Sequence, residues 1–352
     1  MKIEEIDKNF LPPTLPEGVE LEYRSVREEP FHIWGLIYEE NSFRRLPTEV
    51  AKATNEGVEF LHAHSAGGRV TFRTNSRYIA ISVKVHSVAR FSHFPTCGAS
   101  GFDLYVGTQF AGSYLPPYAV ENGYGRMVSF GASEEREITI NFPLYTAVES
   151  LHIGLEKGAS LSAYNPYRDM PPIVYYGSSI TQGGCASRPG NAYQAKISRE
   201  LFVDHINLGF SGSAKGEDAM AEYIASLPMS VFVMDYDHNA PSVKHLEETH
   251  ERFYKIIREK NPDLPIVFVS APDFFKPLSP DYRSKQLRRA TVMKTYVKNR
   301  AEDKNLYFVD GASFYQSTDR DFCTVDNCHP NDLGFYHMAL GILPTIRKIL
   351  KI

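Results

Sequence analysis

The chain has 352 residues, of which 43% are apolar and 23% are charged, and its formal net charge is -4. The length favours two domains, and the composition is typical of a soluble globular protein. The nearly balanced charge gives no reason to expect nucleic acid or a membrane surface as a partner. No apolar run is long enough to span a membrane, and acidic residues stand where a signal peptide would be apolar, so we expect a cytoplasmic protein.

The four cysteines are scattered along the chain, so a disulfide framework is not expected. Cys323 and Cys328 could form half of a zinc site, but no second pair of ligands lies near them. We therefore expect neither a metal nor an organic cofactor.

Residues 20–160 consist of short runs in which apolar and polar residues often alternate, which is typical of strands with one buried face. The strongest runs are Val58–His62, Arg69–Arg73, Tyr78–Val85, Phe102–Val106, Glu137–Phe142 and Leu151–Leu155. No clear helical stripe interrupts them, and turn residues separate them at intervals close to those of a β-sandwich. This pattern predicts an all-β domain, a sandwich or jelly roll, over residues 1–165.

After a linker at Tyr164–Pro172, apolar runs alternate with helical stretches. The predicted strands are Ile173–Tyr176, His205–Leu208, Val231–Asp235, Ile266–Ser270 and Leu306–Val309. The predicted helices are Ala192–Phe202, Gly216–Ser226, Val243–Glu259, Arg283–Arg300 and a last helix from Pro330 or Asn331 nearly to Ile352. Such alternation predicts an α/β domain over residues 171–352, a parallel sheet with helices on both faces and functional residues at the carboxyl ends of its strands.

Residues that could carry chemistry follow several of these strands. Ser179 lies in the turn after the first strand, at the start of a helical stretch, and could be a nucleophile if a base activates it. Taken alone, the turn could also be a phosphate-binding or capping turn, although it lacks the P-loop lysine and the glycine spacing of dinucleotide sites. Asp326 and His329 are three residues apart just before the last helix, so the carboxylate could orient the imidazole; a surface Asx turn is the other interpretation.

Two further stretches offer groups that stabilise negative charge. Gly212, after the second strand, would let a backbone N–H approach a substrate, or would simply form a turn. Asn239, after the third strand, offers a neutral amide donor, while the adjacent Asp237 and His238 could contact substrate or cap the next helix.

These four stretches, in this order, resemble the SGNH hydrolases, also called the GDSL esterase/lipase family, over about residues 171–350. The resemblance implies a flavodoxin-like three-layer domain in which Ser179 is the nucleophile and Asp326 and His329 complete a catalytic triad. It also implies that the backbone N–H groups of Ser179 and Gly212 and the Asn239 side chain form an oxyanion hole. The motifs depart from the family at Ser178, where an acidic residue is usual, and at two positions of the third block, Asp237 for glycine and Ala240 for aspartate.

The Gly-Ser-Ser-Ile-Thr variant of the first block, with a β-domain before it, resembles carbohydrate esterases that remove acetyl groups. We therefore expect a serine esterase that hydrolyses short acyl esters, with a small molecule or an oligosaccharide as substrate. The alternatives are an acyltransferase with the same triad and a carbohydrate-binding protein whose hydrolase domain is inert. Arg188, Asp237 and His238 are candidate substrate-binding residues, Pro272–Phe275 could line the cleft, and a homo-oligomer is left open.

Overall fold

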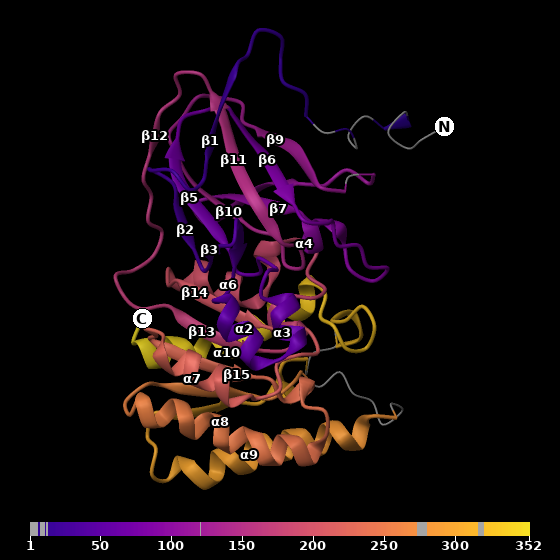
Figure 1. The fold of residues 1–352 in the computed structure, drawn as a ribbon, viewed down its shortest axis with the longest axis vertical. Helices are drawn as coiled ribbons and strands as arrows, with labels where there is room; N and C mark the ends of the chain where they lie inside the picture. Colours follow the sequence, from indigo (N-terminus) through magenta and orange to yellow (C-terminus); the bar gives the residue numbers. More distant parts are fainter. Residues whose placement is uncertain (1–5, 8–10, 12, 120, 273–279, 316–319) are drawn as a thin grey trace.

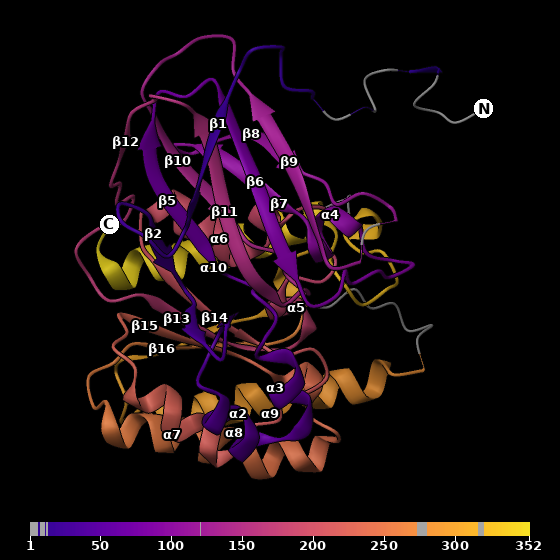
Figure 2. The same cartoon turned by 45° about the horizontal axis from the view of Figure 1, so that its top comes forward.

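The computed structural model describes residues 6, 7, 11, 13–119, 121–272, 280–315 and 320–352. Antiparallel sheets lie at one end of the molecule and the helices α7, α8 and α9 at the other, with a parallel sheet between them (Figures 1 and 2). Of the helices in the described ranges, none is sufficiently long and apolar to cross a membrane.

The N-terminal part contains two antiparallel sheets, which we call the β-sandwich. The four-stranded sheet has the order β1 (Leu21–Ser25), β11 (Val148–Glu156), β6 (Tyr78–Val85) and β9 (Gly123–Ser129). The six-stranded sheet has the order β12 (Leu161–Ser162), β5 (Arg69–Thr74), β10 (Arg136–Asn141), β7 (Phe102–Val106) and β8 (Gln109–Tyr114), and β2 (His32–Trp34) pairs with β5. Inward side chains of both sheets, such as Phe72, Ile81, Ile140 and Ile153, form one buried core.

A small hairpin of β3 (Ile37–Glu39) and β4 (Ser42–Arg44) and three short helices accompany these sheets. The helices are α2 (Thr48–Thr54), α3 (Glu56–Leu61) and α4 (Thr96–Ser100). The predictions that Val58–His62 is a strand and that no helix interrupts the β region are therefore wrong. The Asn55 side chain accepts a hydrogen bond from the Val58 N–H and caps α3, and Val58 and Leu61, three residues apart, are buried on one helical face.

The helices α2 and α3 belong to the α/β core rather than to the β-sandwich core. Ala51, Val58 and Leu61 share a buried cluster with Met220 and Ala221 of α7 (Asp218–Ser226). This early segment therefore packs on the second half of the molecule. The division of the chain into two domains at residue 165 stays a prediction.

The C-terminal part is an α/β domain around a five-stranded parallel sheet. The strand order is β14 (His205–Gly209), β13 (Ile173–Gly177), β15 (Val231–Asp235), β16 (Ile266–Val269) and β17 (Leu306–Val309). In chain order this is 2-1-3-4-5, the flavodoxin-like order, whose switch point lies between the carboxyl ends of the first and third strands. The predicted α/β fold class is confirmed.

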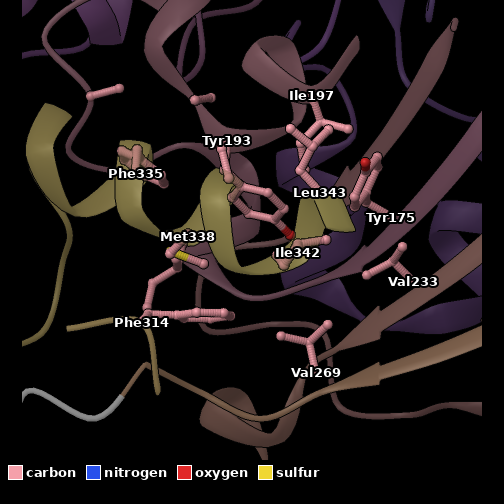
Figure 3. Close-up of a cluster of buried hydrophobic side chains, with 14 of the residues drawn as sticks. Tyr175, Tyr193, Ile197, Val233, Val269, Phe314, Phe335, Met338, Ile342 and Leu343 are labelled. Atoms are coloured by element: carbon pink, nitrogen blue, oxygen red, sulfur yellow. The ribbon is translucent and has the colours of Figure 1, made fainter. Parts of the chain in front are cut away.

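Alternate residues of β13 point to opposite faces of this sheet, as a strand requires. Ile173 and Tyr175 join one buried cluster with α6 (Tyr193–Leu201) and α10 (Asp332–Leu350), and Figure 3 shows Tyr175 among the side chains of these helices. Val174 and Tyr176 join the other cluster, with α7, α8 (Val243–Lys260) and α9 (Tyr282–Arg300). Hydrophobic burial on both faces therefore makes three layers.

Short helical segments occupy several loops at the carboxyl edge of the sheet. They are α5 (Ser179–Gln182) and the 3-10 helices η2 (Pro189–Asn191), η3 (Asp237–Asn239), η4 (Gly311–Ser313) and η5 (Arg320–Phe322). These loops carry most of the candidate functional residues.

Candidate active site

Ser179 begins α5, directly after the first parallel strand. Its backbone position is set by Ser178, whose side chain accepts a hydrogen bond from the Ile180 N–H and caps the helix, and by Gly183, whose φ of 112° ends it. Gly177 is required at the strand end because an added Cβ would lie 2.1 Å from Thr181 Oγ1 and 2.3 Å from the Asp235 carbonyl oxygen. Ser179 is 6% exposed, so this turn presents one hydroxyl from a tightly packed edge.

The structure brings Ser179, His329 and Asp326 together although 150 residues separate the first two. Ser179 Oγ lies 2.9 Å from His329 Nε2, and His329 Nδ1 lies 2.8 Å from Asp326 Oδ2. Asp326 Oδ1 accepts hydrogen bonds from the backbone N–H of Cys328 at 3.0 Å and of His329 at 2.7 Å. A proton on Nδ1 would face the carboxylate and leave Nε2 to accept the hydroxyl proton.

The environment of Asp326 favours its charged form. Partial burial alone would raise the pKa of this carboxyl, but hydrogen bonds from the His329 side chain and from two backbone N–H groups hold the pKa below its ordinary value. Asp326 is therefore ionised near neutral pH, as a group that orients an imidazole must be.

Gly212 and Asn239 lie on neighbouring loops, since Asn239 Nδ2 donates a hydrogen bond to the Phe210 carbonyl oxygen at 2.7 Å. Gly212 has a φ of 66°, and no atom lies within 4 Å of an added Cβ, so its backbone borders open space. Within the described ranges, the backbone N–H groups of Ser179 and Gly212 donate to no protein acceptor. Both are therefore available to a bound oxygen.

Asp237 is buried and His238 is partly buried. Asp237 is 2% exposed and accepts a hydrogen bond from the Ala271 N–H at 3.0 Å, and burial raises its pKa to about 6. His238 Nε2 lies 3.0 Å from Cys328 Sγ, and burial lowers its pKa to about 4. A contact of either residue with substrate stays a prediction. Through its contact with Cys328, His238 is positioned to support the loop that carries His329.

Arg188 is held by the β-sandwich. Its guanidinium donates to Asp103 Oδ2 at 3.1 Å and to the Tyr105 hydroxyl, and it lies 3.8 Å above the centre of the Phe110 ring. The structure thus places Arg188 at the junction of the two parts of the molecule, and its role toward substrate also stays a prediction. Of the predicted cleft segment Pro272–Phe275, the last three residues lie outside the described residues.

Sequence reasoning missed several residues that the β-sandwich contributes around Ser179. The Tyr145 hydroxyl donates to the Ser179 carbonyl oxygen at 3.1 Å. Gln182 Nε2 lies 3.2 Å from His64 Nδ1, and Gln182 Oε1 accepts a hydrogen bond from the Ser211 N–H at 3.0 Å. No spacing in the sequence indicates these contacts. From the sequence alone, an aromatic residue or a histidine in a β region is interpreted as an ordinary core or surface residue.

His93, before α4, also lies at the site, with its ring centre 5.7 Å from that of His329. A ring nitrogen of His93, the Cys185 thiol and a ring nitrogen of His329 all lie within 4.8 Å of one another, the one group within the described ranges that could hold a metal ion. This group differs from the Cys323 and Cys328 pair that we considered from the sequence.

Two cavities lie near the Ser179 and His329 pair, and each includes a residue that contacts or approaches one of the two, although neither Ser179 nor His329 borders them. One, of about 420 Å³, is bordered by Tyr145 and His64 and by exposed or charged groups such as Glu59 and Arg44. The other, of about 410 Å³, is bordered by His93 and Cys185. Only residues of the N-terminal part border the first cavity, whereas residues of both parts of the chain border the second.

Comparisons with known proteins agree with this architecture. Residues 170–347 match the GDSL-like lipase/acylhydrolase family model, and residues 21–161 match a model of the N-terminus of SGNH-hydrolase-type esterases. The name of that second model, GxDLY, spells Gly101–Tyr105 of this chain. None of the curated proteins matches.

Solved structures cover nearly the whole chain. A GDSL-like lipase from Bacteroides ovatus is 32% identical, covers 95% of this chain and 99% of its own, and has a TM-score of 0.86. A salicylyl-acyltransferase from a tetracycline biosynthetic pathway is 20% identical, with 94% and 97% covered and a TM-score of 0.73. An acetyl xylan esterase from Butyrivibrio proteoclasticus is 12% identical, with 94% and 99% covered and a TM-score of 0.60. Both halves of the chain and their arrangement thus recur together in these structures. This chain is a carboxylic ester hydrolase of the GDSL-like lipase/acylhydrolase family.

Proposed function

We propose that the protein hydrolyses short acyl esters, acetyl esters above all, on carbohydrate alcohols through a Ser179 acyl-enzyme. The observation that carries this proposal is the pair of contacts at 2.9 Å and 2.8 Å that link Ser179 Oγ to His329 and His329 to Asp326. Such a chain makes a hydroxyl nucleophilic, because the imidazole accepts its proton and the carboxylate stabilises the resulting imidazolium.

In the first half of the reaction, Ser179 Oγ attacks the ester carbonyl carbon while His329 Nε2 takes the hydroxyl proton. The oxyanion accepts hydrogen bonds from the backbone N–H groups of Ser179 and Gly212. Asn239 Nδ2 carries two hydrogens and uses one for the Phe210 carbonyl, so the other remains for the oxyanion. His329 then gives its proton to the alcohol oxygen as the C–O bond breaks.

In the second half, water attacks the acyl-enzyme and His329 takes a proton from it. The tetrahedral intermediate collapses, His329 returns the proton to Ser179 Oγ, and the acid leaves. No step uses a metal or an organic cofactor.

The surroundings of Ser179 favour a short acyl group, because this side chain lies in a tightly packed turn and is only 6% exposed. The acetyl xylan esterase among the structural neighbours agrees with an acetylated carbohydrate, although at its level of identity it supports the fold only.

The test is a release assay on acetylated oligosaccharides beside p-nitrophenyl acetate. Ser179→Ala should abolish the burst of p-nitrophenol and reduce acetate release by at least a thousandfold, whereas Ser226→Ala, on the exposed part of α7, should change neither. Unchanged turnover in Ser179→Ala would instead favour a carbohydrate-binding protein with an inert hydrolase domain.

A transferase would use the same acyl-enzyme and differ only in the acceptor. Analysis of the products formed with and without an added alcohol separates the two functions, because a transferase delivers the acyl group to the alcohol in preference to water.

A further inference from the structure

The cavity beside His329 has a defined position in the reaction. His329 must give its proton to the departing alcohol oxygen, so the alcohol has to leave on the side of the site where the imidazole lies. His93 and Cys185 border this cavity, and their nitrogen and sulfur atoms lie within 4.8 Å of a His329 ring nitrogen. Two residues in the wall of this cavity of about 410 Å³ therefore lie next to the proton donor, as the wall of an alcohol subsite must.

Most polar side chains in the wall of this cavity are already hydrogen-bonded within the protein. The Ser187 hydroxyl donates to the Asp332 carboxylate, whose other oxygen accepts from the Ser187 N–H at 2.8 Å. Asn331 caps α10 through its oxygen and donates to the Phe322 carbonyl through its nitrogen. His93 is different: it is exposed, and within the described ranges neither ring nitrogen has a hydrogen-bond partner.

The rest of the wall is apolar. Pro95, Val325 and Leu333 border the cavity, and Val325 is 46% exposed. A ligand that fits such a wall has an apolar face and one polar group at the position of His93, next to the oxygen that His329 protonates.

We propose that His93 hydrogen-bonds to a hydroxyl on the carbon next to the ester-bearing carbon, and that the natural alcohol is therefore a 1,2-diol unit, as in a sugar ring or a glycerol. A gap of at most 4.8 Å between the two imidazoles can be bridged by two oxygens on adjacent carbons, one on each ring. This inference rests on the proposed acyl-enzyme and makes the β-sandwich, through His93, the part that selects the alcohol.

The same subsite must bind an acceptor when the reaction runs in the transfer direction. The acceptor hydroxyl gives its proton to His329 as its oxygen attacks the acyl carbon, and Ser179 Oγ leaves with a proton returned by His329, so the atoms and charges balance. The same acyl-enzyme reacts with water and with every alcohol acceptor. Differences between alcohols in the ratio of ester formed to acid formed therefore report only on how each alcohol binds.

The experiment uses p-nitrophenyl acetate as the acyl donor and the isomers 1,2-propanediol and 1,3-propanediol as competing acceptors. The measured quantity is the monoacetate formed per acetate released, corrected for the number of primary hydroxyls. One added hydrogen bond corresponds to about a fivefold preference, so the wild type should favour the 1,2 isomer by about that factor. His93→Ala should reduce the preference to about one, and His93→Gln, which keeps a donor and an acceptor, should restore part of it.

His86→Ala is the matched control, because His86 is also an exposed β-sandwich histidine but borders the other cavity. It should keep the fivefold preference. A preference that is the same in the wild type and in His93→Ala overturns the inference, as does a wild type with no transfer to either diol. Failure of the proposed function is separate and visible beforehand, as a p-nitrophenol burst that survives in Ser179→Ala.

Discussion

The Asp103 carboxylate, fully buried in the β-sandwich, binds the Arg188 guanidinium of the loop that follows α5, with 3.1 Å between Oδ2 and Nη1. The same oxygen accepts a hydrogen bond from the Gly190 N–H at 2.9 Å, and the other accepts one from Asn141 at 2.7 Å. Asp103 is the acidic residue of the Gly101–Tyr105 segment. The β-sandwich is thus fastened to the loop that carries Cys185 to the edge of the proposed active site.

This fastening predicts that Asp103→Asn is strongly destabilising. The amide keeps the shape but has one acceptor oxygen instead of two, so an N–H group faces the donors on one side of residue 103, and the guanidinium loses its charged partner. Breaking one side of a buried pair costs about 3 kcal/mol, which urea unfolding would measure. Lys157→Ala is the control: its partner Glu20 and Lys157 itself are both more than 60% exposed, so its loss should cost less than about 1 kcal/mol. Equal effects of the two variants would contradict the structural role of Asp103.

The regular part of the fold could be predicted because each element obeys a local pattern. The apolar runs at Val231–Asp235 and Leu306–Val309 are strands with the predicted ends, since buried parallel strands read as short continuous apolar segments. The segment Val58–His62 could not be assigned correctly because five residues fit both a period of 2 and a period of 3.6. Its helix forms through the Asn55 cap and the packing of Val58 and Leu61 beside α7, contacts that lie outside the window.

The residues of the candidate site likewise fall into those that the sequence could identify and those that it could not. Ser179, Asp326 and His329 stand in short motifs at predictable strand and helix ends, so their types and spacing could be recognised. His93 and Arg188 depend on how the β-sandwich docks on the α/β domain, which no local periodicity encodes. That docking brings together residues far apart in the chain, and only the structure identifies them.

Asn239→Ala should reduce kcat by about a hundredfold or more, with a much smaller change in KM. The amide would stabilise charge that exists only in the transition state, and loss of one such donor costs at least this factor in other enzymes. Circular dichroism checks that the fold survives loss of the contact with the Phe210 carbonyl. Asn305→Ala, which removes a bond to the Asp263 carbonyl far from the site, is the control. A kcat unchanged by Asn239→Ala would remove this residue from the oxyanion hole.

Asp326→Asn should lower kcat by on the order of a thousandfold or more, because an amide opposite Nδ1 no longer favours the imidazole tautomer with a free Nε2. The pH dependence of the loss is the sharper test. Hydrogen bonds hold the pKa of Asp326 below its ordinary value despite partial burial, so the wild-type carboxylate stays ionised from pH 5 to 8. The ratio of wild-type to variant kcat should therefore stay well above one throughout this range. A ratio that approaches one at either end would show that Asp326 acts in another way.

His250→Phe should make the protein less sensitive to acid. His250 is 2% exposed between Tyr236 and Phe268, and burial lowers its pKa to about 3. The unfolded chain, with an ordinary histidine pKa near 6.5, then binds a proton that the folded state does not, so the free energy of unfolding falls as the pH drops below about 6.5. Between pH 7.5 and pH 5.0 this histidine alone accounts for a loss of about 2 kcal/mol, which phenylalanine would abolish.

Urea unfolding of both proteins at these two pH values gives the difference directly. Part of the acid sensitivity should remain in the variant, because burial also lowers the pKa of His64 to about 3 and of His238 to about 4. Phenylalanine also removes a buried ring nitrogen, Nδ1, that has no partner within the described ranges, so the variant should be at least as stable as the wild type at pH 7.5. An unchanged loss of stability between the two pH values would mean that His250 is protonated in the folded state, which its aromatic surroundings oppose.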